Sequence, residues 1–225
     1  MSIQSNLNTI KESLPEQVTL VAVSKTKPVS DLIQAYEAGQ RIFGENKIQE
    51  MTDKWEEMPK DIQWHMIGHV QSNKVKFMAP YVTLIHGVDS LKLLQEINKQ
   101  ALKNNRIIDC LLQIYIAEEE SKFGLDEEEL NELLASSAFK ELENIRILGL
   151  MGMATFTEDQ NQIRKEFTHL KSIFDSIKQR KDALQCASTL DHFSTISMGM
   201  SGDYQLAIEC GSTMVRIGSS IFGGR

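Results

Sequence analysis

The sequence has few cysteines and few prolines: its 225 residues contain three of the first and four of the second. Cys110, Cys186 and Cys210 are odd in number and far apart. That pattern argues against a disulfide framework and against a zinc site. All three lie beside apolar residues, so we expect reduced thiols in the core and predict a cytoplasmic protein.

Three further features are missing. No apolar run approaches about 18 residues, so no segment is expected to span a membrane. The first residues lack the apolar stretch that a signal peptide needs. The formal net charge is −7 and no basic stripe occurs, which argues against nucleic-acid binding.

The composition is that of an ordinary globular protein, with 41% hydrophobic and 24% charged residues. The chain has no linker rich in proline, glycine or serine and no low-complexity run. We therefore expect one domain over residues 1–225.

Strand and helix patterns alternate along the chain. Apolar positions at helical spacing over residues 2–13 predict a helix before the first strand. Helical patterns then follow strand candidates at 18–24, 41–44, 62–68, 81–86, 107–116, 145–151, 193–198 and 213–217. Eight such repeats close a parallel barrel, so the expected fold class is α/β: a single (β/α)8 TIM-type barrel with an extra N-terminal helix. An open, doubly wound sheet is the alternative.

Lys25 follows the apolar first strand. Side chains alternate along a strand, so Lys25 shares a face with Val21 and Val23. If those valines fill the barrel, Lys25 reaches its mouth, where an amine can attack a carbonyl. The alternative is a lysine that merely extends into water. Lys27 is expected to be exposed at a helix start, because Pro28 follows it.

The last strand runs into a turn of small residues. Backbone N–H groups at Gly218 and Ser219 can approach an anion closely. Arg216, near the end of the strand, can direct a permanent cation at the same ligand. Ser201, after the seventh strand, is predicted to be a helix N-cap. Together these residues form the phosphate site expected after strands seven and eight of a barrel; a bare turn and a simple cap are the alternatives.

Other candidates lie in or just after the second, third and sixth strand candidates. Asn46 can hydrogen-bond at the mouth or cap the next helix. His65 can face the barrel interior, although a lone histidine is more often structural. Gly149 and Gly152 leave little bulk after the sixth strand, as either a flat ligand or close strand packing would require. No spacing of cysteine, histidine and carboxylate predicts a metal site.

One barrel mouth is thus predicted to hold an amine nucleophile, an anion site and a fixed cation. A phosphorylated aldehyde satisfies all three groups at once. Pyridoxal 5′-phosphate (PLP) is the cofactor of that description.

Several segments resemble the pyridoxal phosphate homeostasis protein family. They are 21–28 (VAVSKTKP), 43–46 (FGEN), 65–68 (HMIG), 71–74 (QSNK), 197–203 (SMGMSGD) and 211–218. They occur in the family's order over nearly the whole chain. The resemblance implies a fold-type III barrel similar to the N-terminal domain of alanine racemase.

The same resemblance implies the roles of the site residues. These roles are a Schiff base on Lys25, a contact from Arg216 to the pyridine nitrogen, ring lining by Asn46, and phosphate binding by Ser201, Gly218 and Ser219. Lys122 matches a second family lysine, implied to contact the cofactor transiently.

The function implied is that of a protein that buffers PLP or delivers it to apo-PLP enzymes, as part of vitamin B6 homeostasis, without an established turnover reaction. We expect the protein to be cytoplasmic and monomeric. The alternative function is that of an amino-acid racemase-like PLP enzyme. Alanine racemase has a second domain with an acid/base tyrosine, and the sequence stops at residue 225 without one. Tyr115 is the only tyrosine whose placement at a strand end is in question, and His65 is the remaining acid/base candidate. A third class is an interaction module that uses the cofactor as its signal.

Overall fold

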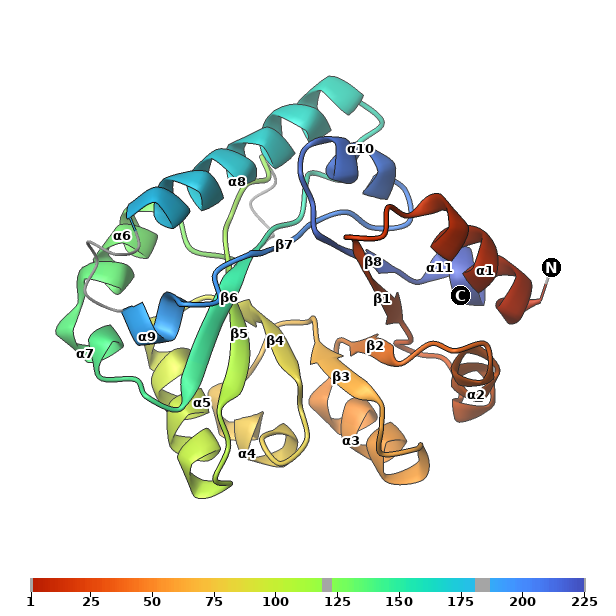
Figure 1. Ribbon diagram of the computed structural model, residues 1–225, viewed down its shortest axis with the longest axis horizontal. Coiled ribbons are helices and arrows are strands. Elements are labelled where there is room, and N and C mark those ends of the chain that lie inside the picture. Colours follow the sequence, from red (N-terminus) through yellow and green to blue (C-terminus); the bar gives the residue numbers. More distant parts are fainter. Residues whose placement is uncertain (1, 119–122, 181–186, 225) are drawn as a thin grey trace.

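The computed structural model describes residues 2–118, 123–180 and 187–224. Parallel strands form a closed barrel in which each strand pairs with its neighbours in sequence and β8 pairs with β1 (Figure 1). The predicted barrel is confirmed, and the open sheet is not the fold of this chain. The strands are β1 (Thr19–Val23), β2 (Ile42–Glu45), β3 (Gln63–Met66), β4 (Leu84–Val88), β5 (Ile108–Gln113), β6 (Ile145–Met151), β7 (Thr195–Ser197) and β8 (Met214–Ile217).

Most strands are shorter than the apolar runs that predict them. After β5, for example, Ile114 and Ile116 are still buried although the strand has ended. A buried loop thus extends the apolar pattern beyond the ladder of hydrogen bonds. β4 also begins later than residue 81, because the N–H groups of Tyr81 and Val82 donate to the carbonyl of Met78 in the preceding helical turn.

Helices cover the outside of the barrel (Figure 1). They are α1 (Ile3–Ser13), α2 (Val29–Glu37), α3 (Ile48–Glu57), the 3-10 helix η1 (Ser72–Lys74), α4 (Val75–Met78), α5 (Leu91–Lys103), α6 (Glu127–Ala135), α7 (Ser137–Lys140), α8 (Gln160–Arg180), α9 (Ala187–Leu190), α10 (Tyr204–Glu209) and α11 (Ser219–Phe222). α7 and α9 were not predicted, since four residues are too few to show a helical period. Within the described ranges, no helix is long and apolar enough to cross a membrane.

The predicted N-terminal helix is present and joins the two ends of the chain. α1 lies beside α11 (Figure 1), and Asn6 Nδ2 donates to the carbonyl of Ile221 at 3.0 Å. The first helix thereby supports the segment after β8.

Alternation along the strands separates two apolar clusters. Val21, Leu84, Leu111, Met151 and Met214 form the smaller one, inside the barrel. The larger one fills the layer between strands and helices, and its bulkiest fully buried members include Phe43, Trp64, Phe139 and Phe167.

The thiols only partly match the expectation of core positions. Cys110 is a buried free thiol, whereas Cys210 is free and only half-buried. Cys186 lies outside the described residues.

Small residues near the end of β6 serve close packing. A Cβ at Gly149, where φ is +155°, would lie 1.7 Å from the carbonyl oxygen of Thr195 on β7. A Cβ at Gly152 would lie 2.8 Å from Leu170 Cδ2 and 2.9 Å from Ile116 Cδ1. Of the two interpretations open for these glycines, the contacts support strand and helix packing.

Gly149→Ala is therefore expected to destabilise the fold by at least about 3 kcal/mol, because the added methyl overlaps a backbone oxygen that can move only if β6 and β7 separate. Urea unfolding measures this loss. Gly202→Ala is the matched control, since nothing lies within 4 Å of a Cβ there. Equal stability of the two variants would contradict the packing role.

Candidate functional site

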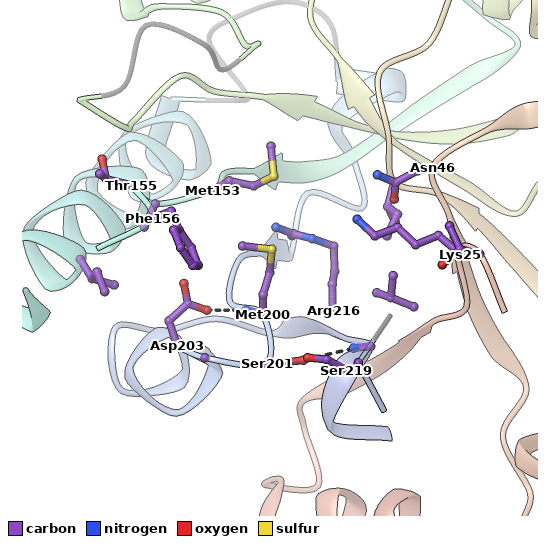
Figure 2. A pocket seen from close by; sticks show the side chains of 18 of the residues that line it. Lys25, Asn46, Met153, Thr155, Phe156, Met200, Ser201, Asp203, Arg216 and Ser219 are labelled. Carbon is purple, nitrogen blue, oxygen red and sulfur yellow. Dashed lines mark hydrogen bonds between the residues drawn. The ribbon is translucent and has the colours of Figure 1, made fainter. Parts of the chain in front are cut away.

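A cavity of about 530 Å³ opens where the strands end. Its lining comes from the segments at the carboxyl ends of β1, β2, β3, β6, β7 and β8. Figure 2 shows Lys25 and Asn46 on one side and Met153, Phe156 and Met200 on another, with Arg216 between them. The volume is in the usual range for a small-molecule site, about 300–1,000 Å³.

Lys25 lies where the strand alternation predicts. Val21 is inside the barrel, and Val23 and Lys25 line the cavity above it. The Lys25 amine forms no hydrogen bond or ion pair with the described part of the chain. Of the two described lysines that line the cavity, Lys25 and Lys27, it is Lys25 whose amine is free to react with a ligand.

Lys27 also borders the cavity, but its amine is bound elsewhere. Nζ donates to the carbonyls of Phe222, at 3.2 Å, and Gly224, at 2.9 Å. The side chain is half-buried, so the expectation that Lys27 is exposed was wrong. The reason is that the segment after α11 folds back over the start of α2 and uses this ammonium as a donor.

Arg216 is buried in the wall of the cavity, with 4% of its surface exposed. Nη1 donates to the carbonyl of Ser197 at 2.8 Å and to Ser197 Oγ at 2.6 Å, while Nη2 donates to the carbonyl of Gly152 at 3.0 Å. Burial lowers the pKa of Arg216 to about 10, so the guanidinium stays charged at neutral pH. Nε and the second N–H of Nη2 donate to no described residue, which leaves two N–H groups for a ligand.

Two buried histidines lie behind Arg216. Ser197 Oγ is 3.0 Å from His86 Nδ1, and His86 Nε2 is 3.0 Å from His65 Nδ1. Because Ser197 Oγ already accepts from the arginine, its own proton goes to His86 Nδ1. His86 then carries its proton on Nε2 and donates to His65, whose proton is on its own Nε2.

Both histidines are neutral. Burial lowers the pKa of His65 to about 3, and burial followed by the nearby His65 and Arg216 lowers the pKa of His86 well below its usual value. His65 does face the barrel interior, but as one member of this chain of donors and acceptors. Its Nδ1 lone pair is already used.

Ser201 is not a helix N-cap. The N-cap of α10 is Asp203, and Asp203 Oδ1 accepts from the N–H of Met200 at 2.5 Å. Ser201 Oγ instead accepts from the N–H of Gly218 at 3.3 Å and so joins the loop after β7 to the loop after β8. The N-cap prediction was wrong, because α10 begins only at Tyr204 and the residue before it is Asp203, whose side chain makes no capping bond.

The turn after β8 has the bare backbone that the sequence suggests. A Cβ at Gly218 would lie 3.0 Å from the carbonyl oxygen of Val23. Ser219 is the first residue of α11, and the first N–H groups of a helix have no partner within it. Gly218, Ser219 and Ser201 all line the cavity.

Asn46 lines the cavity and does not cap a helix. The N-cap of α3 is Lys47, which makes no side-chain capping bond. A Cβ at Gly68 would lie only 2.4 Å from the carbonyl oxygen of Asn46. This close approach of two backbones fixes Asn46 at the rim.

No sequence pattern indicated the apolar side of the cavity. Met153, Phe156 and Met200 line it, and Phe156 is 95% exposed (Figure 2). They are loop residues without periodicity, so only the closed barrel brings them together.

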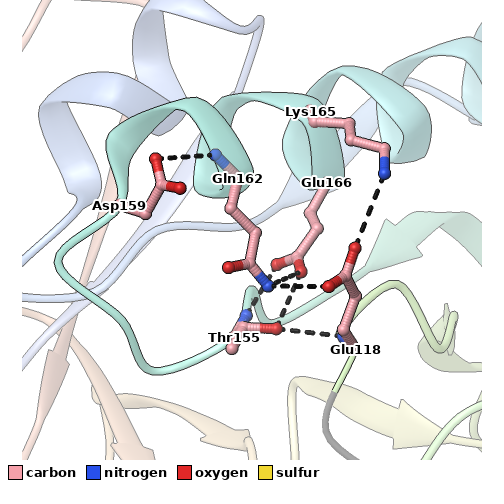
Figure 3. Close-up of polar contacts among 6 residues, drawn as sticks. All are labelled: Glu118, Thr155, Asp159, Gln162, Lys165 and Glu166. Atoms are coloured by element: carbon pink, nitrogen blue, oxygen red, sulfur yellow. Dashed lines mark hydrogen bonds and ion pairs between the residues drawn. The ribbon is translucent and has the colours of Figure 1, made fainter.

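Glu166, also missed, holds the loop that carries Phe156 (Figure 3). This buried carboxylate accepts from the backbone N–H and the hydroxyl of Thr155, both at 2.7 Å. Thr155 Oγ1 in turn accepts from the N–H of Glu118 at 3.0 Å. A signal existed: Glu166 interrupts the apolar face of α8, whose other buried residues are all hydrophobic.

Two candidates from the sequence remain, Lys122 and Tyr115. Lys122 lies outside the described residues. Tyr115 follows β5, and among the described residues no tyrosine lines the cavity.

Similar sequences identify the relatives of this chain. The family model for the N-terminal domain of alanine racemase matches residues 1–225. The pyridoxal phosphate homeostasis protein of Pasteurella multocida is 37% identical over 100% of this chain and 98% of its own length. That of Escherichia coli is 39% identical over 94% of this chain and 87% of its own length.

Solved structures of the same kinds of protein are also similar to this chain. PipY of Synechococcus elongatus with PLP bound has a TM-score of 0.87 and 32% identity, covering 99% of this chain and 100% of that one. An alanine racemase of Clostridium difficile has a TM-score of 0.78 at 16% identity, covering 100% of this chain and 60% of that one, which shows the shared fold alone.

The barrel and its mouth therefore define the class typified by the N-terminal domain of alanine racemase. Within that class, the chain belongs to the pyridoxal phosphate homeostasis protein family.

The buried histidines predict an acid-sensitive fold. His65 has a pKa of about 3 in the folded protein and about 6.5 when unfolded, so only the unfolded chain takes up a proton between these values. The stabilisation from neutral His65 is complete above pH 6.5 and is lost as the pH falls, by about 1.4 kcal/mol per pH unit.

His65→Asn keeps an acceptor near the Nδ1 position and removes this titration. Between pH 7 and pH 5, its unfolding free energy should fall by about 2 kcal/mol less than that of the native chain in urea titrations. His192→Asn, at an exposed position, should retain the native pH dependence. Parallel pH profiles for the native chain and His65→Asn would show that His65 is not held neutral.

Proposed function

We propose that this chain binds PLP in the cavity and buffers it or delivers it to other proteins. One observation carries the proposal: a free lysine amine and a buried guanidinium face one cavity whose rim is made of small residues with backbone donors. The name shared by the relatives and the PLP-bound form of PipY support it.

The residues fit such a cofactor. The cavity has the volume for a small planar ligand, and its Met153, Phe156 and Met200 side supplies apolar surface. The rim at Gly218 is too close to Val23 for a side chain, so the backbone there is bare. The Ser201 hydroxyl accepts from Gly218 and keeps its own proton available for a phosphate oxygen.

Each residue then has one role. PLP supplies an aldehyde, with which an amine condenses to a C=N bond and releases water. Lys25 provides that amine and Asn46 lines the ring. Ser201 and Ser219 hold the phosphate, and Gly218, whose N–H already donates to Ser201 Oγ, keeps the backbone bare beside it. Arg216 would be the partner of the pyridine nitrogen, where a guanidinium could only donate and would therefore keep that atom unprotonated.

Donation from Arg216 favours holding the cofactor over amino-acid chemistry, because an unprotonated ring nitrogen withdraws electrons weakly. A racemase also needs an acid/base group on the second face of its substrate. His65 is neutral and hydrogen-bonded at Nδ1, and no tyrosine of the described residues lines the cavity. Among the described residues, the racemase-like alternative thus has Lys25, but neither His65 nor a tyrosine can serve as its second base.

The proposal also covers the cellular location, the oligomeric state and the proteins that receive PLP. We propose a cytoplasmic monomer, in keeping with free thiols at Cys110 and Cys210, and apo-PLP enzymes as recipients. Light scattering of the purified protein tests the monomer.

Covalent attachment is expected at Lys25. Borohydride added to the PLP-loaded protein should fix a pyridoxyl group there, identified by peptide mass spectrometry, and Lys25→Ala should lose it. Lys27→Ala is the matched control and should be labelled like the native chain, since the Lys27 amine is bound to carbonyls. Labelling at Lys27, or none at all, would refute the assignment.

The phosphate group should contribute most of the affinity of this chain for PLP. Each hydrogen bond lost to a charged group costs about 1.5–3 kcal/mol, so pyridoxal should bind roughly tenfold or more weakly than PLP in equilibrium titrations. Ser219→Asp should bind PLP less well than Ser219→Ala, because a carboxylate repels the phosphate. Ser172→Asp, on the exposed side of α8, is the charge-matched control. Equal affinities for pyridoxal and PLP would rule out the phosphate site.

A further inference from the structure

A buried charged cluster lies directly behind Lys25, on the far side of the strands from the cavity. Glu45 on β2 is fully buried and Lys54 on α3 is 5% exposed. Glu45 points away from the cavity, because its neighbours Gly44 and Asn46 face inward. None of the roles proposed for the cavity uses these charges. With Glu50, also on α3, they form what we call the clamp.

The Lys54 ammonium is the centre of the clamp. Nζ donates to Glu45 Oε1 at 2.7 Å and to Glu50 Oε1 at 2.6 Å. It also donates to the carbonyl oxygen of Ser24 at 2.8 Å. Glu45 Oε1 accepts in addition from the Ser24 hydroxyl at 2.6 Å. The residue immediately before Lys25 is therefore held at both its backbone and its side chain.

The residue immediately after Lys25 is held as well. The N–H of Thr26 donates to Glu50 Oε1 at 2.6 Å. Thr26 has φ +64°, in the left-handed region that a β-branched residue rarely adopts. The N–H of Lys27 donates to the carbonyl of Ser24 at 3.1 Å and closes a tight turn, in which glycine would be the usual residue at the Thr26 position.

These charges are costly to bury. Glu45 Oε2 has no hydrogen-bond partner, and burial raises the pKa of Glu45 above its usual value even though Lys54 is adjacent. Apolar side chains of similar volume commonly stabilise a fold as well as a buried ion pair does. A contribution to packing therefore does not explain why charged residues occupy these positions. Their hydrogen bonds to the strained turn at Ser24 and Thr26 do explain it.

We propose that Lys54, Glu45 and Glu50 position Lys25 by fixing Ser24 and Thr26 on either side of it. The inference rests on the proposed function, in which the Lys25 amine reacts with PLP. None of the three clamp residues lines the cavity, so each acts through the turn and not on the ligand. The clamp sets where the amine lies, and the cavity binds the ligand independently of it.

Glu50 is the best residue for a test. Removing Lys54 leaves Glu45 buried without a counter-charge and endangers folding, whereas Glu50 has a side chain that is 24% exposed. Glu50→Ala removes the acceptor for Thr26, and Glu50→Gln keeps an acceptor oxygen. Asp175→Ala is the matched control, because it removes another helical pair at the same spacing, Lys171–Asp175 on α8.

Two ligands distinguish an effect on the position of the Lys25 amine from an effect on ligand binding in the cavity. The rate of covalent reaction is followed with PLP, and binding without reaction with pyridoxine 5′-phosphate, which has the phosphate but no aldehyde. Glu50→Ala should react roughly tenfold or more slowly than the native chain and bind pyridoxine 5′-phosphate within about twofold of it. Glu50→Gln should recover most of the rate, and Asp175→Ala should match the native chain in both.

The outcomes distinguish the two proposals. A native chain that does not react with PLP at Lys25 overturns the proposed function, and the positioning role with it. A native chain that reacts, beside a Glu50→Ala variant that reacts equally fast, overturns the positioning role alone. Equal losses of reaction rate and of pyridoxine 5′-phosphate affinity in Glu50→Ala also overturn it, because they indicate general damage to the cavity.

Discussion

The pairing of the first strand with the last is the contact on which the site depends. In that pairing Val21 lies opposite Arg216. Both side chains therefore share the inner face, and the lysine four residues beyond Val21 reaches the same mouth as the arginine. A shift by one residue would turn Arg216 into the helix layer and leave Lys25 without its neighbour.

Rules that act along a single strand predicted much of this arrangement. The barrel followed from eight repeats, the place of Lys25 followed from alternation, and that of Arg216 from its position near the end of the last strand. Ser201 was misassigned because the sequence does not show that α10 begins only after Asp203, two residues beyond the serine. Glu166 was missed because the barrel rule points only to the ends of strands, although its place in an apolar helix face was visible.

The histidine chain could not have been predicted. His65, His86 and Ser197 lie on three strands, and the bonds between them span 21 and 111 residues of sequence. Their proton positions depend on Arg216, which can donate but never accept. His65 considered alone remains a candidate acid/base, whereas in the network it is neutral and its Nδ1 accepts from His86.

The order of the strands has a consequence for synthesis. β8 is made after every other strand, and the last residues of the chain, beyond β8, supply α11, the carbonyl of Phe222 that binds Lys27 and the packing surface for α1. At the stage of synthesis when β1 to β7 have been made, the nascent chain still lacks β8, which closes the barrel between β7 and β1. The cavity thus combines residues that follow the first strand of the barrel with residues that follow its last strand. A ligand that contacts both Lys25 and Arg216 can therefore bind only after β8 has been synthesised and has paired with β1.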